Sequence, residues 1–176
     1  MRNVKAVAVT LALACAAATP APASQARAGG APLNGTYLVT SNGDWAKTND
    51  VYHDETTVRR VWTVASSCVD SQHCTGQVSS SDGWSATITY DGSTWIVNRV
   101  VPNWQPCPDG TSEPGDQVYR FWGVDAANQP DDSSVTLLGG FDRTSGRSGD
   151  CGTNKPLVVE MPLRVQRIER WSSLLP

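Results

Sequence analysis

The sequence has few of the side chains on which most catalytic and metal sites depend. Its only histidines are His53 and His73, and it contains no Gly-x-Ser-x-Gly nucleophile elbow. No run of basic residues exists, which argues against a nucleic-acid partner. Beyond the first residues, no apolar stretch is long enough to cross a membrane. These absences predict a protein without catalytic residues, metal or cofactor.

Three short stretches could carry chemistry, and each has a plainer interpretation. His53 stands beside two carboxylates and could act as a general base, although a solvated loop explains it better. Ser148 lies in a Gly-rich segment that is faintly like the serine loop of trypsin-type proteases, but a disulfide-anchored loop fits the segment better. Asp131 and Asp132 could bind calcium weakly, yet no spaced set of oxygen ligands follows them.

The first 28 residues have the order of charges and apolar residues that is typical of a secretory signal peptide. Arg2 and Lys5 precede an apolar run, and small residues follow it. Cys15 allows an alternative, a lipoprotein signal that would anchor the chain to the outer face of the membrane. We expect a signal peptide over 1–28, a disordered linker over 29–33 and a β domain over 34–170. Without residues 1–28 the chain keeps 11 basic and 17 acidic residues, a net charge of −6.

Four cysteines remain after the signal segment, which in an exported chain indicates two disulfides. Three pairings are possible. We favour Cys68 with Cys74, which closes a small loop between neighbouring strands, and Cys107 with Cys151, which closes a long one. A zinc site is the competing interpretation, and the wide spacings argue against it.

The segment 74–101 predicts three antiparallel strands joined by two tight turns. Asp82-Gly83 and Asp91-Gly92 are the turn signals, and we expect type I′ turns with positive φ at both central residues. Between the turns, one face is apolar or aromatic and the other is polar, the alternation of a half-buried strand. The first face holds Trp84, Ala86, Ile88 and Tyr90, and the second holds Ser85, Thr87 and Thr89.

The rest of the chain predicts further strands of the same kind, for a total of about eight. Strands are expected over 36–40, 57–65, 117–124, 134–141 and 157–168, whereas 103–116 should be irregular. Gly139-Gly140 suggests a bend or bulge, and Pro162 an edge or bulge. The fold class is all-β: a single antiparallel barrel or a two-layer sandwich, with no membrane span, and we expect a monomer. A barrel could also enclose one small ligand.

Seven tryptophans are many for a chain of this length. They indicate either core packing or an aromatic-lined ligand pocket. Trp45 and Trp104 fall in predicted loops and are the better ligand-binding candidates. Arg99 and Arg120 lie among aromatic strand residues and could stack on them or pair with acids.

Two stretches resemble small exported proteins of mycobacteria and related actinobacteria. These stretches are Pro32-Leu33-Asn34-Gly35-Thr36-Tyr37 and the segment from Ser148-Gly149-Asp150-Cys151-Gly152 to Met161-Pro162-Leu163-Arg164. The Cys68 to Cys74 loop and Gly83-Trp84 belong to the same likeness. The resemblance implies a location in the cell envelope or the medium, and it brings no mechanism with it. Gly35-Thr36-Tyr37 also resembles the Gly-x-Trp of lipocalin-like barrels, with Tyr in place of Trp.

Three classes of function follow. The first is a non-catalytic binding module for a small apolar or carbohydrate ligand of the envelope, or for an envelope protein. The second is a secreted inhibitor or surface interaction protein without a pocket, and the third is a hydrolase. A Trp-lined cavity favours the first class. A filled barrel with an exposed apolar loop favours the second, and a cleft that joins His53 to a carboxylate or to Ser148 favours the third.

Overall fold

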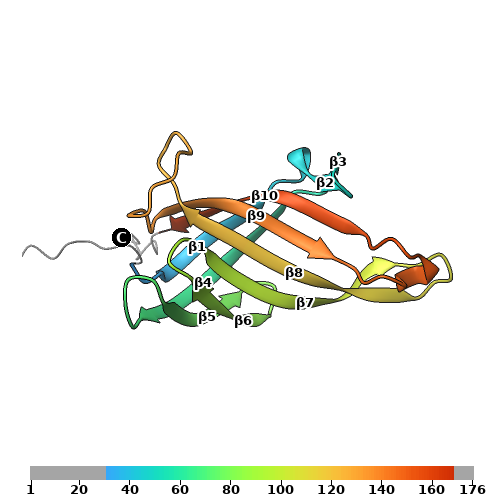
Figure 1. The fold of residues 1–176 in the computed structure, drawn as a ribbon, viewed down its shortest axis with the longest axis horizontal. Helices are drawn as coiled ribbons and strands as arrows, with labels where there is room; N and C mark the ends of the chain where they lie inside the picture. Colours follow the sequence, from blue (N-terminus) through green and yellow to red (C-terminus); the bar gives the residue numbers. More distant parts are fainter. Residues whose placement is uncertain (1–30, 169–176) are drawn as a thin grey trace, which may run out of the picture.

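A computed structural model describes residues 31–168, which form a closed barrel of antiparallel strands (Figure 1). The predicted signal peptide over 1–28, its Cys15 and Trp171 lie outside the described residues. The expected β domain over 34–170 also extends two residues beyond them. None of the described segments is a helix that is long and apolar enough to span a membrane.

Eight strands make up the wall of the barrel, and each pairs with the next in antiparallel register. They are β1 (Asn34–Ser41), β4 (Val58–Cys68), β5 (Cys74–Ser80), β6 (Ser85–Tyr90), β7 (Trp95–Pro106), β8 (Ser112–Gly123), β9 (Leu137–Ser145) and β10 (Val158–Ile168). β10 returns to pair with β1, so the sheet closes on itself. Closure satisfies the backbone groups of both edge strands, and it decides between the two predicted architectures in favour of the barrel.

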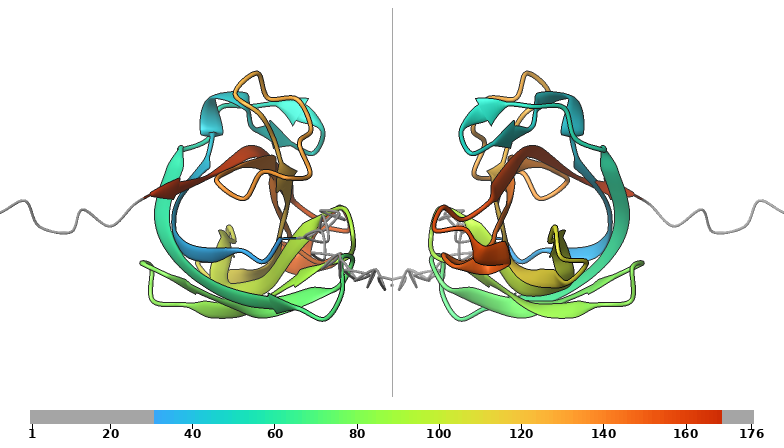
Figure 2. Two further views of the ribbon diagram at one scale, coloured as in Figure 1. Left: turned by 90° about the vertical axis from the view of Figure 1, so that its left-hand side faces the viewer. Right: turned by 90° about the vertical axis from the view of Figure 1, so that its right-hand side faces the viewer.

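A small hairpin lies outside the barrel wall. It consists of β2 (Lys47–Thr48) and β3 (Val51–Tyr52), and β2 pairs with the first residues of β10. The short 3-10 turn η1 (Gly43–Trp45) precedes it, and a second one, η2 (Asp150–Gly152), lies near the far end of the molecule (Figure 1). Together β2, β3 and η1 form a ledge on the outer surface, which Figure 2 shows outside the ring of strands, at the top of each view.

The inside of the barrel divides into an apolar part and a polar part. The buried apolar cluster is largely aromatic, and its members are Leu33, Tyr37, Val39, Trp62, Val64, Cys74, Val78, Ile88, Tyr90, Trp95, Val97, Tyr119, Phe121, Leu138, Leu163 and Val165. Trp62 contacts Tyr119 edge to face, with 4.9 Å between ring centroids. Toward the pole where β1 ends, the buried residues become polar: Ser41, Gln117, Asp142 and Thr144. The strand alternation that the sequence predicts is what brings both groups inside.

The meander over 74–101 is confirmed, but its turns are not of type I′. Gly83 and Gly92 have positive φ, +83° and +94°, whereas Asp82 and Asp91 do not. At the first turn, the amide of Ser80 donates to the carbonyl of Trp84, and the amide of Gly83 donates to the carbonyl of Ser80. The loop therefore has three residues and needs only one left-handed residue, which the glycine provides.

The prediction that 103–116 is irregular was wrong. β7 continues past Val101 to Pro106, and β8 begins at Ser112, so the two strands form a long hairpin that extends beyond the barrel (Figure 1). A bulge between Val101 and Gln105 accommodates Pro102 and the positive φ of Asn103, because the ladder is interrupted where proline could not donate.

Both disulfides have the pairing that we favoured. Cys68 and Cys74 face each other across β4 and β5, and Cys107 at the hairpin tip is joined to Cys151 in η2. The predicted bulge at Gly139-Gly140 is absent, since β9 keeps continuous register with both neighbours there. Gly140 instead permits close approach of β8, because a Cβ atom at this position would lie 2.0 Å from the carbonyl oxygen of Arg120.

Candidate functional site

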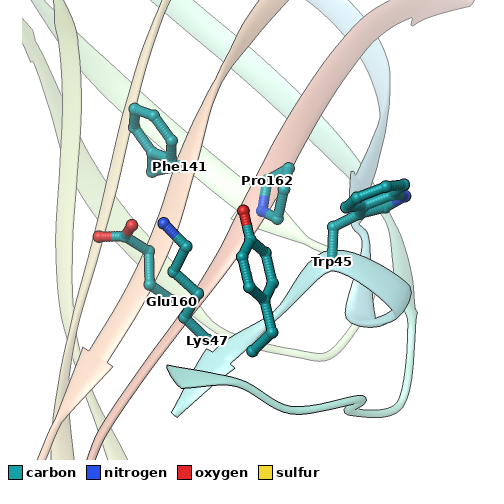
Figure 3. Close-up of a pocket in the computed structure, with 6 residues that line it drawn as sticks. Trp45, Lys47, Phe141, Glu160 and Pro162 are labelled. Carbon is teal, nitrogen blue, oxygen red and sulfur yellow. The ribbon is translucent and has the colours of Figure 1, made fainter. Parts of the chain in front are cut away.

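The outer surface of the barrel carries a groove beneath the ledge that η1, β2 and β3 form. The groove has a volume of about 240 Å³ and is lined by Trp45, Lys47, Tyr52, Phe141, Glu160 and Pro162. Figure 3 shows Phe141 and Glu160 on one side, with Pro162 and Trp45 on the other. A second hollow of about 390 Å³ adjoins it and shares Phe141 and Glu160. Because they share these two residues, the two hollows are together called the outer groove below.

Strand register explains how residues so distant in sequence line one groove. Lys47 is paired with Tyr52 on β3 and with Glu160 on β10. The row continues from Glu160 to Arg143 on β9, then to Val118 on β8 and Asn98 on β7. Six neighbouring strands therefore contribute one residue each, and the row runs across the strands for about 24 Å at the usual spacing of about 4.8 Å.

A second row lies two residues further along the strands and forms the other side of the groove. Phe141 is its centre, paired with Pro162 on β10 and Arg120 on β8. Pro162 lies where β1 has ended, and its carbonyl accepts from the amide of Asn42 just beyond that strand. The N–H that proline lacks would have pointed to this same side, beyond the last β1–β10 pair, so no rung of that ladder is lost and proline is tolerated at the edge-like position that the sequence predicts.

Three aromatic rings of the groove are exposed to solvent. The exposed fractions are 63% for Trp45, 67% for Tyr52 and 45% for Phe141, values that are high for rings of this size. Trp45 is held in η1, where the Asn42 side chain accepts from the amide of Asp44 and caps the turn. The ledge is also attached to the barrel by Asn49, whose side chain accepts from the amide of Val158 on β10. These contacts fix the backbone that presents the rings.

The groove is rich in cations, although the whole chain is acidic. Lys47, Arg120 and Arg143 line it, against the single carboxylate of Glu160. Arg143 Nη1 lies 3.6 Å from Glu160 Oε2. Lys47 Nζ lies 5.1 Å from the centre of the Tyr52 ring, within the range of a cation–π contact. The groove thus combines aromatic faces with charged hydrogen-bond donors.

The four predicted ligand-binding residues fall in three places. Trp45 and Arg120 line the two halves of the outer groove. Arg99 belongs to the inward-facing row of β7, and its guanidinium lies 4.5 Å from the centre of the Trp84 ring. Trp104 is half-buried in β7, not in a loop, and its ring packs so closely on Gly115 that a Cβ atom there would lie 2.7 Å from it.

Several residues of the groove could not be predicted from the sequence. Tyr52 and Lys47 lie in a polar segment that predicts a loop. Phe141 ends the strand predicted over 134–141 and lies in the middle of β9, whose outer face cannot be recognised without its neighbours. An aromatic residue inside a polar loop is the one signal that could have indicated Tyr52 as a ligand-binding candidate, as it indicated Trp45.

The residues with possible catalytic roles are not brought together by the fold. His53 Nδ1 lies 3.2 Å from Glu55 Oε1 on the exposed segment after β3, outside the outer groove. The Ser148 hydroxyl donates to the carbonyl of Asn154 in the η2 loop, at the far end of the molecule. Within residues 31–168, no group of three or more His, Cys, Asp or Glu residues gathers as metal ligands would.

Comparison with known proteins identifies the fold. No family model and no curated protein matches this chain. A solved structure that does match is the monomer form of the Mycobacterium tuberculosis PknI sensor domain. It superposes with a TM-score of 0.55 at 12% sequence identity, over 79% of this chain and 89% of the sensor domain. At this identity the likeness establishes a shared β fold.

Proposed function

We propose that this protein is an exported, non-catalytic binding module, and that its outer groove holds a carbohydrate of the cell envelope that carries acidic groups. The observation that carries the proposal is the exposure of the Trp45, Tyr52 and Phe141 rings around one groove. Aromatic faces stack on the apolar faces of sugar rings, and charged side chains at their edges hydrogen-bond hydroxyl and carboxylate groups. Three cations against one carboxylate favour an acidic ligand.

The filling of the barrel argues for an external site. Trp62, Tyr37 and Tyr119 are completely buried and occupy the middle of the barrel, where a small apolar ligand was a possible occupant. A length of about 24 Å also suits an extended chain of sugars better than a single compact molecule. The PknI structure is a sensor domain, and a ligand-binding role outside the cytoplasm is in keeping with that neighbour and with two disulfides.

The test is calorimetric titration of the protein with acidic and neutral envelope oligosaccharides, for wild type and for Trp45→Ala and Tyr52→Ala. Each variant should weaken binding about tenfold or more, equivalent to about 1.4 kcal/mol. Because both rings are exposed, the melting temperature should hardly change. Val69→Ala is the matched control, since Val69 is exposed but lies at the Cys68–Cys74 turn, away from the groove.

Two results would count against a carbohydrate ligand. One is no heat of binding with any oligosaccharide. The other is an equal loss of affinity in Val69→Ala and Trp45→Ala. Arg120→Gln adds a test of charge, because it should weaken acidic oligosaccharides more than neutral ones.

A protein partner is the second candidate function, and one observation favours it. Val51 is 68% exposed at the tip of the ledge and is not part of the groove lining. A filled barrel with an exposed apolar hairpin is also what we expect of a surface interaction protein. Val51→Ser separates the candidates, because it should weaken binding to an envelope protein and leave oligosaccharide binding unchanged.

Export itself is part of the proposal. Mass spectrometry of the mature N-terminus should show that residues 1–28 have been removed. A diacylglycerol-modified Cys15 would replace free secretion by anchoring, and an intact Met1 would contradict export.

A further inference from the structure

Three arginines of the outer barrel wall surround one exposed aromatic ring. Phe141 is the middle residue of β9 and is 45% exposed. Arg120 on β8 is its cross-strand partner, and Arg143 follows it two residues later on β9. Arg164 lies on β10, two residues beyond Pro162, which is the other partner of Phe141. At the usual spacings within a sheet, all three arginine Cα atoms lie within about 8 Å of the Phe141 Cα atom. Arg120, Arg143 and Arg164 are called the arginine cluster below.

The arginine cluster differs from the rest of the described surface. Its three side chains are exposed, because each alternates with inward residues of its strand. The outward positions of β5 and β6 hold only serine, threonine and glutamine. Many acidic side chains lie instead in turns, where they accept hydrogen bonds from nearby backbone amides. These are Asp70, Asp91, Asp109, Asp125 and Asp131.

The positive charge of the cluster is only partly compensated. Glu160 is the nearest acid, and its Oε2 lies 3.6 Å from Arg143 Nη1. Within residues 31–168, neither Arg120 nor Arg164 forms a salt bridge. Three cations against one carboxylate leave an excess of two positive charges. Like charges at this separation repel one another, so an anionic partner is favoured over this surface.

The surface between the arginines is aromatic and suits a sugar ring. The Trp122 ring on β8 lies beside Phe141, with 5.8 Å between ring centroids. A sugar can stack on such a floor while acidic groups at its edges reach the arginines. The arginines lie on different sides of Phe141, so acidic groups on neighbouring units of a chain suit them better than a single small anion does. The ledge beside the groove makes this surface concave, which favours a polymer over a flat lipid bilayer.

We propose that the carbohydrate of the outer groove carries an acidic group on each successive sugar unit, and that one unit stacks on Phe141. The arginine cluster binds the acidic groups of this unit and of its two neighbours. This assignment rests on the proposed function and deepens it, because it specifies the charge density of the ligand. It also adds Arg164 to the site, although Arg164 lines neither of the two hollows. Glu160 lowers the affinity, because it competes with the ligand for Arg143.

Three oligosaccharides of equal length test the charge density by calorimetric titration. Hexagalacturonate has an acidic group on every ring, a hyaluronan hexasaccharide has one on every second ring, and cellohexaose has none. Hexagalacturonate should bind about tenfold or more tightly than the hyaluronan hexasaccharide, equivalent to about 1.4 kcal/mol. Added salt should weaken hexagalacturonate binding the most, because its ion pairs are exposed and therefore screened.

Two substitutions test the residues. Arg164→Gln should weaken hexagalacturonate binding about tenfold and leave cellohexaose binding unchanged. Arg59→Gln is the matched control and should change neither. Arg59 is an exposed arginine of the same cross-strand row, and it is separated from Arg164 by Thr40 on β1. Glu160→Gln should strengthen hexagalacturonate binding about threefold, as expected for the loss of an exposed competing ion pair. A misfolded protein would not gain affinity, so this variant also controls for damage to the fold.

The outcomes separate this inference from the proposed function. Equal binding of hexagalacturonate and the hyaluronan hexasaccharide would overturn the assigned charge density. An equal loss in Arg59→Gln and Arg164→Gln, or no gain in Glu160→Gln, would overturn the assigned residues. In each of these cases the proposed function still stands if an oligosaccharide binds and Trp45→Ala weakens it. If none of the three oligosaccharides binds, both proposals fail.

Discussion

Removing the Cys107–Cys151 disulfide should destabilise the protein more than removing Cys68–Cys74. The first bridge spans 44 residues of sequence and the second spans 6. In the chain-entropy model these separations correspond to about 4 and about 2.4 kcal/mol of unfolding free energy. The longer bridge excludes more conformations of the unfolded chain, because β8 and β9 lie within the loop that it closes.

The experiment compares two double variants, each with both cysteines of one bridge replaced by alanine, in urea unfolding. Alanine avoids burying a hydroxyl at Cys74, which is only 5% exposed. Trp104 packs near the base of the β7–β8 hairpin, so fluorescence should also report loosening there in the variant that lacks Cys107–Cys151. Equal losses in the two variants, or a larger loss for the short bridge, would refute the reasoning that sequence separation sets the order.

Three further predictions concern stability. Gly83→Val and Gly92→Val should each cost about 1–3 kcal/mol in urea unfolding, because a β-branched residue is strained at positive φ; unchanged midpoints would contradict this. Trp62→Ala should cost about 3–5 kcal/mol and Trp62→Phe much less, since the buried Trp62 Nε1 has no partner among the described residues. Asp142 has a higher pKa in the folded protein than in the unfolded chain, so its protonated form stabilises the fold. This contribution to the free energy of unfolding is complete below the unfolded pKa of about 3.9 and is lost as pH rises through the raised folded pKa. Asp142→Asn should remove this loss of stability with rising pH. If the unfolding free energies of wild type and variant change with the same slope from about pH 3 to 8, the pH dependence does not come from Asp142.

Local patterns predicted much of the fold. The alternation from Trp84 to Tyr90 and the Asp-Gly signals identified the central meander, and the cysteine count with its spacing gave the favoured pairing. The extension of β7 through Pro102 was missed because proline ends most strands. Here a bulge bypasses its missing donor, and pairing with β8 resumes at Gln105.

The site was less predictable, because it depends on register between distant strands. Lys47, Glu160 and Arg143 become neighbours only when β2 joins β10 and β10 joins β9. No pattern within any one of these segments indicates that contact. Trp45 could be chosen because an aromatic residue in a polar loop has no core to join. Trp104 was chosen by the same reasoning, and it instead packs on Gly115 within the β7–β8 hairpin.

Closure of the barrel by β1 and β10 has a consequence for how the molecule would face its surroundings. Thr36 is paired with Ile168, so any chain that precedes the barrel and any chain that follows it leave from the same pole. The tip of the β7–β8 hairpin and η2 lie at the opposite pole (Figure 1). A membrane tether at either terminus would therefore point the opposite pole away from the membrane. The outer groove would then lie along the side of the barrel, open to polymers that run parallel to the membrane surface.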